Sequence, residues 1–352
     1  MKAFWHEIHQ SLSAGEHVVV ATIVSHSGST PRTSGSKMVV FSDGRSSGTI
    51  GGGPVEADVV KSAMTVFTSH NSVIKSYSLN KASGVAEMDL ICGGQLQVLV
   101  EYIPSEDNTI EMYRNLNNAV YDGKSGLWVG RILKKREPDN LEVERSLQID
   151  NGLWIGPLQP SMELQQCLKR QSRGPNITSL LDLEGQQYVL DSITPPKTAY
   201  LIGAGHVAKE IAPLAHRASF RIVVVDDRAE YANTTRFPYA DKVAVCPDCT
   251  EPFEGFRVDK NSYIIIVTRG HSFDKEALAQ ALRTDADYIG MIGSRKKRDQ
   301  IYKNLLDEGF TPSQLERVHC PIGLSINAET PFEIAVSIIA ELIRHRARGN
   351  SS

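Results

Sequence analysis

Three consecutive glycines, Gly51–Gly53, stand between a predicted strand and a predicted helix whose first residue is Pro54. Glycine in regular structure costs about 0.5–1 kcal/mol relative to alanine, so the run indicates either a tight turn or a backbone that a ligand approaches closely. In this register Gly53 is the N-cap and Glu56 lies in the first turn, where unpaired N–H groups and the helix dipole favour an anion. Because no Lys-Ser/Thr pair follows, the run is not a nucleotide P-loop.

Two further loops have the composition of ligand-binding loops. The segment His26–Ser36 is rich in serine and threonine and contains Arg32, and Cys92 precedes the pair Gly93-Gly94. A polar loop with many small donors can surround a polar ligand, although a mobile surface loop has a similar composition. Cys92 is either a small buried residue or a reactive thiol, and in the second case a candidate catalytic group. With the glycine run, these loops predict a polar ligand site in the first half of the chain.

A dinucleotide-binding fingerprint opens the second half of the chain. The hexapeptide GAGHVA, Gly203–Ala208, lies between a predicted strand and a predicted helix, and an acid, Asp226, follows about 20 residues later. Gly203 would make the turn, Gly205 would let the backbone approach a pyrophosphate, and Ala208 would permit close packing of the helix against the strand. Asp226 would accept hydrogen bonds from ribose hydroxyls and repel the 2′-phosphate of NADP, which favours NAD or FAD. The alternative is the same fold with an empty cleft or another ligand.

Two more residue groups follow predicted strands of the second half, at the edge where α/β sheets bind ligands. His271 follows the fourth strand and is the second candidate catalytic residue. Ser294 and Arg295 begin a helix whose four consecutive cations, Arg295–Arg298, oppose the helix dipole. A bound phosphate or carboxylate would offset this repulsion, whereas the other interpretation is a solvated charged face.

The spacing of hydrophobic residues predicts two different patterns of elements. In the first half, helical and β-branched runs with a hairpin turn at Asp43-Gly44 are typical of an α+β domain, and the pentads 126–130 and 152–156 predict two strands of one sheet. In the second half, strand and helix alternate, which predicts a parallel Rossmann-like sheet. The predicted elements are a helix over 3–12, strands over 17–25, 37–42, 45–50 and 95–103, a helix from 54, strands over 198–202, 220–225, 242–245, 263–268 and 288–292, and a last helix capped by Thr330 and Glu333.

The pattern changes just after Thr194-Pro195-Pro196, which marks a domain boundary. We expect an α/β chain: an N-terminal α+β domain over 1–195, in which 106–195 is poorly defined, and a C-terminal Rossmann-like dinucleotide-binding domain over 196–352. The first domain would handle the ligand of the polar loops, and the second would bind a nucleotide.

The composition excludes several classes of function. The 352 residues carry 38 Lys+Arg against 41 Asp+Glu, so no global field attracts nucleic acid or anionic lipid. No apolar run approaches the ~18 residues of a membrane span, and the N-terminus lacks an export signal. Five cysteines fit a reducing compartment, and Cys246-x-x-Cys249 lacks the second pair of a zinc site. We expect a cytoplasmic protein that binds neither nucleic acid nor membrane and has no side chains that ligate a metal ion.

Eight segments, in their order along the chain, resemble the xanthine dehydrogenase accessory family, usually called XdhC/CoxI. They cover about residues 15–103 and 196–346. Their sequences are SGSTPRTSGSKM, GTIGGGPVEA, ICGGQLQVLVE, LIGAGHVAKEIA, VDDR, VTRGHSFD, YIGMIGSRKKR and PIGLSINAETPFEIAVSIIAEL. Many members have cysteine where this chain has Pro54, which leaves Cys92 as the thiol that matches.

The resemblance implies a protein that binds molybdenum cofactor, protects it during sulfuration and delivers it to a xanthine dehydrogenase-type molybdenum hydroxylase in purine catabolism. A cysteine desulfurase would be the sulfur donor, and we expect a homo-oligomer. The cofactor is a pterin with a phosphate and a dithiolene-bound oxo-metal, which suits glycine N–H groups and a helix N-terminus. The expected binding residues are Arg32, Gly51, Gly52, Gly53, Glu56 and Cys92 in the first domain, and Gly203, Gly205, His206, Asp226, Ser294 and Arg295 in the second, where NAD is the expected nucleotide.

An NAD-dependent oxidoreductase acting on a small polar substrate is the alternative function. His271 would be its acid–base group, and the first domain would hold the substrate. The sequence contains isolated histidines rather than a complete proton relay, which favours a non-catalytic cofactor chaperone.

Overall fold

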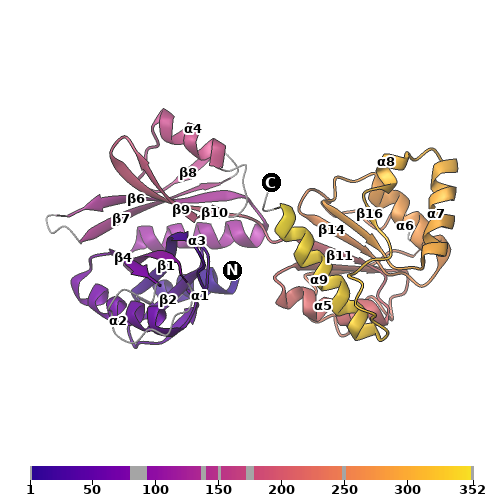
Figure 1. The fold of residues 1–352 in the computed structure, drawn as a ribbon, viewed down its shortest axis with the longest axis horizontal. Helices are drawn as coiled ribbons and strands as arrows, with labels where there is room; N and C mark the ends of the chain where they lie inside the picture. The colour runs from indigo at the N-terminus through magenta and orange to yellow at the C-terminus, as the bar shows by residue number, and fades with distance from the viewer. Residues whose placement is uncertain are drawn as a thin grey trace. The chain divides into compact units, whose positions relative to one another are not determined.

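The computed structural model describes residues 2–79, 93–135, 140–149, 152–171, 178–247 and 251–349. The chain divides into two compact units, Met1–Pro195 and Pro196–Ser352, each with its own sheets (Figure 1). Within the described ranges, no helix has both the length and the apolar character needed to cross a membrane.

The first sheet of unit 1 has five strands in the order β3-β2-β1-β5-β4, and all neighbouring strands are antiparallel. The side chains of β1 alternate between its two faces, as the two-residue period of a strand requires. Val19 and Ala21 pack with α2 on one face, and Val18 and Val20 pack with α1 and α3 on the other. In chain order the elements are α1 (Lys2–Ser13), β1 (Val18–Ser27), β2 (Lys37–Phe41), β3 (Ser46–Gly48), α2 (Gly53–Ser69), β4 (Val73–Ser78), β5 (Gln95–Ile103) and α3 (Asp107–Asp122).

The second sheet of unit 1 is also antiparallel and five-stranded, in the order β8-β7-β6-β10-β9. Trp128 and Leu147 on one face join the core of α1 and α3, while Leu164 and Leu168 of α4 cover the other face. The two glycine-flanked pentads lie on β6 and β8, so the prediction that they belong to one sheet is confirmed. The elements are β6 (Gly126–Lys134), β7 (Leu141–Ile149), β8 (Leu153–Ile155), α4 (Met162–Gln171), β9 (Thr178–Leu183) and β10 (Gln186–Ile193).

Two ion pairs link these two sheets in the interior of unit 1. Arg145 of β7 donates two hydrogen bonds to Glu101 of β5, with Nε–Oε1 at 2.8 Å and Nη2–Oε2 at 2.5 Å. Lys37 of β2 donates from Nζ to Oδ1 of Asp191 on β10 at 2.8 Å. All four side chains are at most 10% exposed, so the pairs hold the sheets together away from solvent.

Unit 2 is built on one parallel sheet of six strands in the order β13-β12-β11-β14-β15-β16. This is the strand order of a Rossmann fold, so the predicted fold class is confirmed. The elements are β11 (Thr198–Ile202), α5 (His206–Arg217), β12 (Arg221–Asp226), β13 (Lys242–Val245), β14 (Ser262–Ile266), α6 (His271–Leu282), β15 (Tyr288–Met291), α7 (Arg295–Asp307), α8 (Pro312–Leu315), β16 (Val318–His319) and α9 (Pro331–Gly349).

Helices cover both faces of this sheet (Figure 1). Ile211 of α5 and Ile338 of α9 belong to the core on one face, and Leu278 of α6 and Ile301 of α7 belong to the core on the other. Because the strands are parallel, their carboxyl ends lie at one edge of the sheet. That edge carries the loop after β11, the end of β12 and the loop after β14.

Candidate functional site

The three polar loops of unit 1 come together in the structure. An added Cβ at Gly94 would lie 2.5 Å from the Ser29 carbonyl oxygen, and one at Gly28 would lie 3.0 Å from the Gly93 carbonyl oxygen. On the other side of the same loop, an added Cβ at Gly51 would lie 3.1 Å from Cβ of Pro31. The loop between β1 and β2 therefore contacts both glycine-rich segments directly.

The glycine run itself adopts a backbone that other residues avoid. The φ angles of Gly51, Gly52 and Gly53 are 128°, 73° and 66°, all in the region that favours glycine. The N-cap of α2 is Gly52 rather than the predicted Gly53, and Pro54 lies one position further into the first turn. A Cβ at Gly52 or Gly53 would meet no described atom within 4 Å, so this side of the loop is open.

The carboxylate of Glu56 accepts hydrogen bonds from part of this loop. Its Oε2 accepts hydrogen bonds from the backbone N–H of Ile50 at 3.2 Å and of Gly52 at 3.0 Å, and from the hydroxyl of Thr49 at 2.9 Å. The Gly51 N–H donates to the Thr49 hydroxyl at 3.0 Å. The N–H groups of residues 50–52 are thus already bonded within the chain, and an added anion would face the first turn of α2 instead.

Of the two remaining predicted residues of unit 1, Arg32 and Cys92, the structure describes Arg32. Arg32 is exposed, and its Cγ lies 3.5 Å from the Cβ position at Gly51, so its side chain begins beside the glycine run. Cys92 lies outside the described residues, and its predicted role stays a prediction.

In unit 2, the two glycines of the fingerprint have different surroundings. Gly203 has a φ of 107°, and an added Cβ would lie 2.6 Å from the Val267 carbonyl oxygen, so this glycine lets two strand ends approach each other. Gly205 is the N-cap of α5 with an ordinary φ of −70°, and a Cβ there would meet nothing described within 4 Å. Neither the backbone conformation at position 205 nor the packing of the described residues around it therefore requires glycine. His206 is the first residue of α5, and its predicted role in binding stays a prediction.

Asp226, the predicted ribose acceptor, is buried and bonded within the chain. Its Oδ2 accepts from the Ala204 N–H at 2.7 Å and from Nη2 of Arg228 at 3.2 Å. Its Oδ1 accepts from the N–H and Nε of Arg228 at 3.0 and 2.9 Å. Burial by itself would raise the pKa of this carboxyl, but the hydrogen bonds from Arg228 and the Ala204 N–H hold the pKa below its ordinary value.

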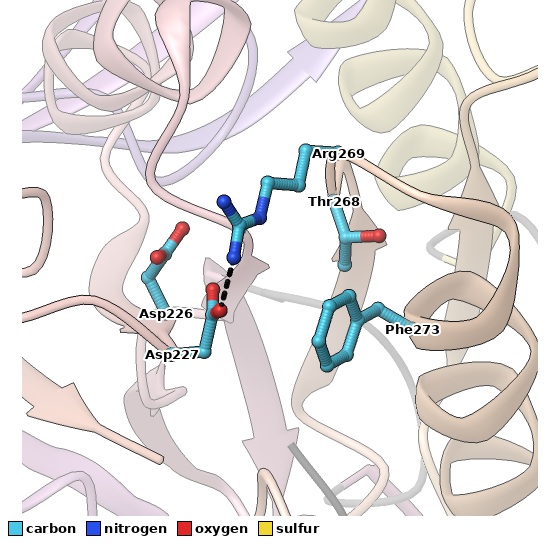
Figure 2. Close-up of a pocket in the computed structure, with 6 residues that line it drawn as sticks. Asp226, Asp227, Thr268, Arg269 and Phe273 are labelled. Atoms are coloured by element: carbon cyan, nitrogen blue, oxygen red, sulfur yellow. Dashed lines mark hydrogen bonds and ion pairs between the residues drawn. The ribbon is translucent and has the colours of Figure 1, made fainter. Parts of the chain in front are cut away.

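A small pocket lies beside Asp226, at the carboxyl ends of β11, β12 and β14 (Figure 2). Its volume is about 220 Å³ even with its open side included, below the ~300–1,000 Å³ of typical ligand pockets. Nη2 of Arg269 crosses it to Oδ2 of Asp227 at 2.7 Å. The lining residues are Gly203, Asp226, Asp227, Thr268, Arg269 and Phe273.

Asp227, Arg269 and Phe273 are not among the site residues predicted from the sequence. The only signal in the sequence for Asp227 and Arg269 is their position: Asp227 follows Asp226, and Arg269 lies two positions before His271. No local pattern in the sequence signals that they pair across the sheet edge.

The four cations at the start of α7 are partly neutralised. Lys297 pairs with Asp274, which is fully buried and also accepts from the Thr268 hydroxyl at 2.6 Å. Arg298 pairs with Asp299 at 2.7 Å. The remaining cations, Arg295 and Lys296, are exposed. The conflict with the helix dipole is therefore smaller than the sequence indicates.

Ser294 is the N-cap of α7, and its hydroxyl accepts from the Lys297 N–H at 3.2 Å. The backbone of His271 begins α6 at the same edge of the sheet, but its side chain is outside the described part of the chain. Cys246 is half-buried after β13, and Cys249 is outside the described residues. In the ranges that the structure describes, no group of three His, Cys, Asp or Glu side chains could hold a metal ion.

Two family models match this chain, one in each of its two units. Residues 11–78 match the XdhC and CoxI family, and residues 199–342 match the XdhC Rossmann domain, together more than half of the chain. A probable xanthine dehydrogenase subunit of Bacillus subtilis (strain 168) is 27% identical over 335 residues, which cover 95% of this chain and 94% of the relative. The molybdenum cofactor insertion chaperone PaoD of Escherichia coli (strain K12) is 20% identical over 333 residues, 95% of this chain and 85% of PaoD.

The fold is also found in a solved structure. The crystal structure of a protein described as a xanthine dehydrogenase from Bacillus halodurans matches with a TM-score of 0.80 and 24% identity, over 98% of this chain and 96% of that chain. The two proteins share their fold from end to end.

Proposed function

The chain belongs to the XdhC and CoxI family, and we propose that it is a chaperone that binds molybdenum cofactor, protects it during sulfuration and delivers it to a xanthine dehydrogenase-type molybdenum hydroxylase. The observation that carries the proposal is the convergence of three polar, glycine-rich loops on one side of unit 1. The similarity to PaoD, a molybdenum cofactor insertion chaperone, over 95% of this chain supports the same role.

The residues of the converging loops suit an anionic pterin cofactor. The open faces of Gly52 and Gly53 leave room for a ligand against the backbone. In the first turn of α2 the N–H groups of Gly53 and Val55 have no intrahelical acceptor, while Pro54 has no N–H. Arg32 and the hydroxyl groups of the 26–36 loop add donors for a phosphate. Glu56 would keep its bonds to the N–H groups behind this face, so the phosphate would lie beside Glu56 rather than replace it.

Unit 2 would bind an adenine nucleotide at the start of α5. Gly205 has no structural requirement for glycine, and α5 has no side-chain N-cap, so a pyrophosphate could approach its first N–H groups. The partners in this proposal are the hydroxylase that receives the cofactor and a cysteine desulfurase that supplies sulfur.

Ligands that co-purify with the protein test the proposal. The chain is expressed under anaerobic conditions in two hosts, one able to make molybdenum cofactor and one unable, and the released ligands are identified by mass spectrometry. We expect a pterin phosphate bearing the dithiolene group from the first host and none from the second. Absence of the pterin from both samples, together with no binding of cofactor released from a purified molybdoenzyme, would refute the proposal.

A further inference from the structure

The pocket of unit 2 is occupied by an ion pair of the chain's own residues. Arg269, in the loop after β14, reaches Asp227, just after β12, across the position expected for the nucleoside part of a dinucleotide (Figure 2). Binding there requires this pair to open or to take part. The inference below, about which residues select the nucleotide, rests on the proposed nucleotide site of unit 2.

Asp226 is poorly placed to receive a ribose. A carboxylate offers about four lone-pair sites, and Asp226 already accepts four hydrogen bonds, one from the Ala204 N–H and three from Arg228. Arg228 is held in turn by the ring of Tyr231, whose centroid lies 3.7 Å from its Cζ. A ribose hydroxyl would have to displace a partly buried guanidinium that Asp226 and Tyr231 both hold.

Asp227 is a better acceptor for a ribose because its partner can leave. The Arg269 side chain is 54% exposed, whereas that of Asp227 is 13% exposed. An ion pair with one exposed partner contributes little, since the freed guanidinium is solvated at once. The second nearby cation, Nε of Arg228, lies 3.5 Å from Oδ1 of Asp227 and is committed mainly to Asp226.

We propose that Arg269 sets the nucleotide selectivity of unit 2, with Asp227 as the ribose acceptor. A ribose with a free 2′-hydroxyl, as in NAD, binds Asp227 only when Arg269 leaves it. A 2′-phosphate, as in NADP, instead takes Arg269 as a charge-assisted partner, because a guanidinium matches phosphate oxygens in pairs. The charge of Asp226 is offset by Arg228, so it does not exclude the 2′-phosphate. The site therefore accepts NADP as well as NAD, whereas Asp226 alone would exclude NADP.

The test is calorimetric titration of the full chain with NAD and with NADP. In Arg269→Ala, NAD should bind about two- to fivefold tighter because the competing pair is gone, and NADP roughly tenfold weaker or more because the phosphate partner is gone. In Asp227→Asn, NAD should weaken by about tenfold while NADP binds no more weakly than before. Arg257→Ala is the matched control, since Arg257 is an exposed arginine paired with Asp259 at 3.1 Å and does not line the pocket.

The outcomes separate this inference from the proposed function. If Arg269→Ala shifts both affinities in the same direction, or if Asp227→Asn leaves NAD unaffected, the assignment of selectivity to this pair is wrong, while a wild type that binds either nucleotide keeps the proposed site. If the wild-type chain binds neither nucleotide, the proposed nucleotide site and this inference both fail.

Discussion

Glycine has two different roles in the candidate sites. At Gly203 and at Gly51–Gly53 the backbone has positive φ angles, so the chain itself requires glycine there. At Gly205 the backbone is ordinary and a side chain would meet no described atom within 4 Å. A glycine that its own structure does not need indicates space kept for something outside the chain.

Replacement of Gly205 by alanine tests this interpretation. The added Cβ would project into the space for a pyrophosphate, so we expect nucleotide affinity to fall by about tenfold or more. The change at an N-cap costs at most ~1 kcal/mol, so the protein should stay folded at the assay temperature. Gly152→Ala is the control, because Gly152 of unit 1 lacks a positive φ and an added Cβ there would also meet no described atom within 4 Å. Equal nucleotide affinities for the two variants would show that Gly205 does not face the ligand.

Arg295 and Lys296 provide a matched pair for the predicted anion site at α7. Both are exposed and adjacent, but Arg295 follows the N-cap Ser294 directly. If an anion binds there, Arg295→Glu should weaken inorganic phosphate and NADP by roughly several-fold to a hundredfold, the loss of one charge-assisted contact. Lys296→Glu should weaken them far less. Similar losses in the two variants, measured by titration at two salt concentrations, would indicate a general charge effect without a site.

Among the elements of unit 1, β5 and β7 depend on a buried ion pair. The Glu101 and Arg145 side chains are 2% and 5% exposed, and Gly130 on β6 leaves the room that Arg145 needs, since a Cβ there would lie 3.0 Å from its Cζ. Removal of one partner of such a pair leaves an uncompensated buried charge.

We therefore expect Glu101→Gln to destabilise unit 1 by about 3–5 kcal/mol. Urea unfolding followed by the fluorescence of Trp128 and its neighbours would report the change. Glu111→Gln, which breaks the exposed pair of Glu111 with Arg114 on α3, is the control and should shift the midpoint little. An equally small shift for Glu101→Gln would mean that the pair does not hold the two sheets together.

Elements with strong local patterns could be predicted from the sequence, because burial repeats with a fixed period along each of them. The strand 198–202, the end of α5 at Arg217 and the cap of α9 by Thr330 and Glu333 lie where the sequence pattern placed them. The pairing of the pentads in one sheet followed from the same patterns.

The bonding inside the candidate sites could not be predicted in this way. Glu56 turns back onto the N–H groups of residues 50–52, and Arg228 takes up the lone pairs of Asp226. Each arrangement depends on side-chain direction and on contacts between separate loops, which leave no period in the sequence. Motif positions indicated where ligands would bind but not which polar groups were already engaged.

At the scale of the whole molecule, one chain combines a cofactor-handling unit and a nucleotide-binding unit in this proposal. The relatives from Bacillus subtilis and Escherichia coli align over 94% and 85% of their own lengths, and each alignment covers 95% of this chain, so both units have counterparts in them. A chaperone of this kind needs a site that holds the cofactor and also releases it. Loops on the surface of a rigid sheet meet that requirement better than an enclosed cavity does.

Transfer of molybdenum cofactor to a cofactor-free xanthine dehydrogenase-type hydroxylase tests the central claim most directly. The matched variants are Gly52→Ala and Gly44→Ala, because Gly52 and Gly44 have positive φ angles of 73° and 85° and neither added Cβ would meet a described atom within 4 Å. Gly52 also has a ψ of −173°, a backbone region essentially restricted to glycine, so the melting temperature of each variant is compared with that of the wild type. Only Gly52 lies in the converging loops. We expect the loaded wild type and Gly44→Ala to restore hydroxylase activity faster than free cofactor does, and Gly52→Ala to be slower by about tenfold. Equal rates for Gly52→Ala and Gly44→Ala, or a wild type no faster than free cofactor, would contradict the account.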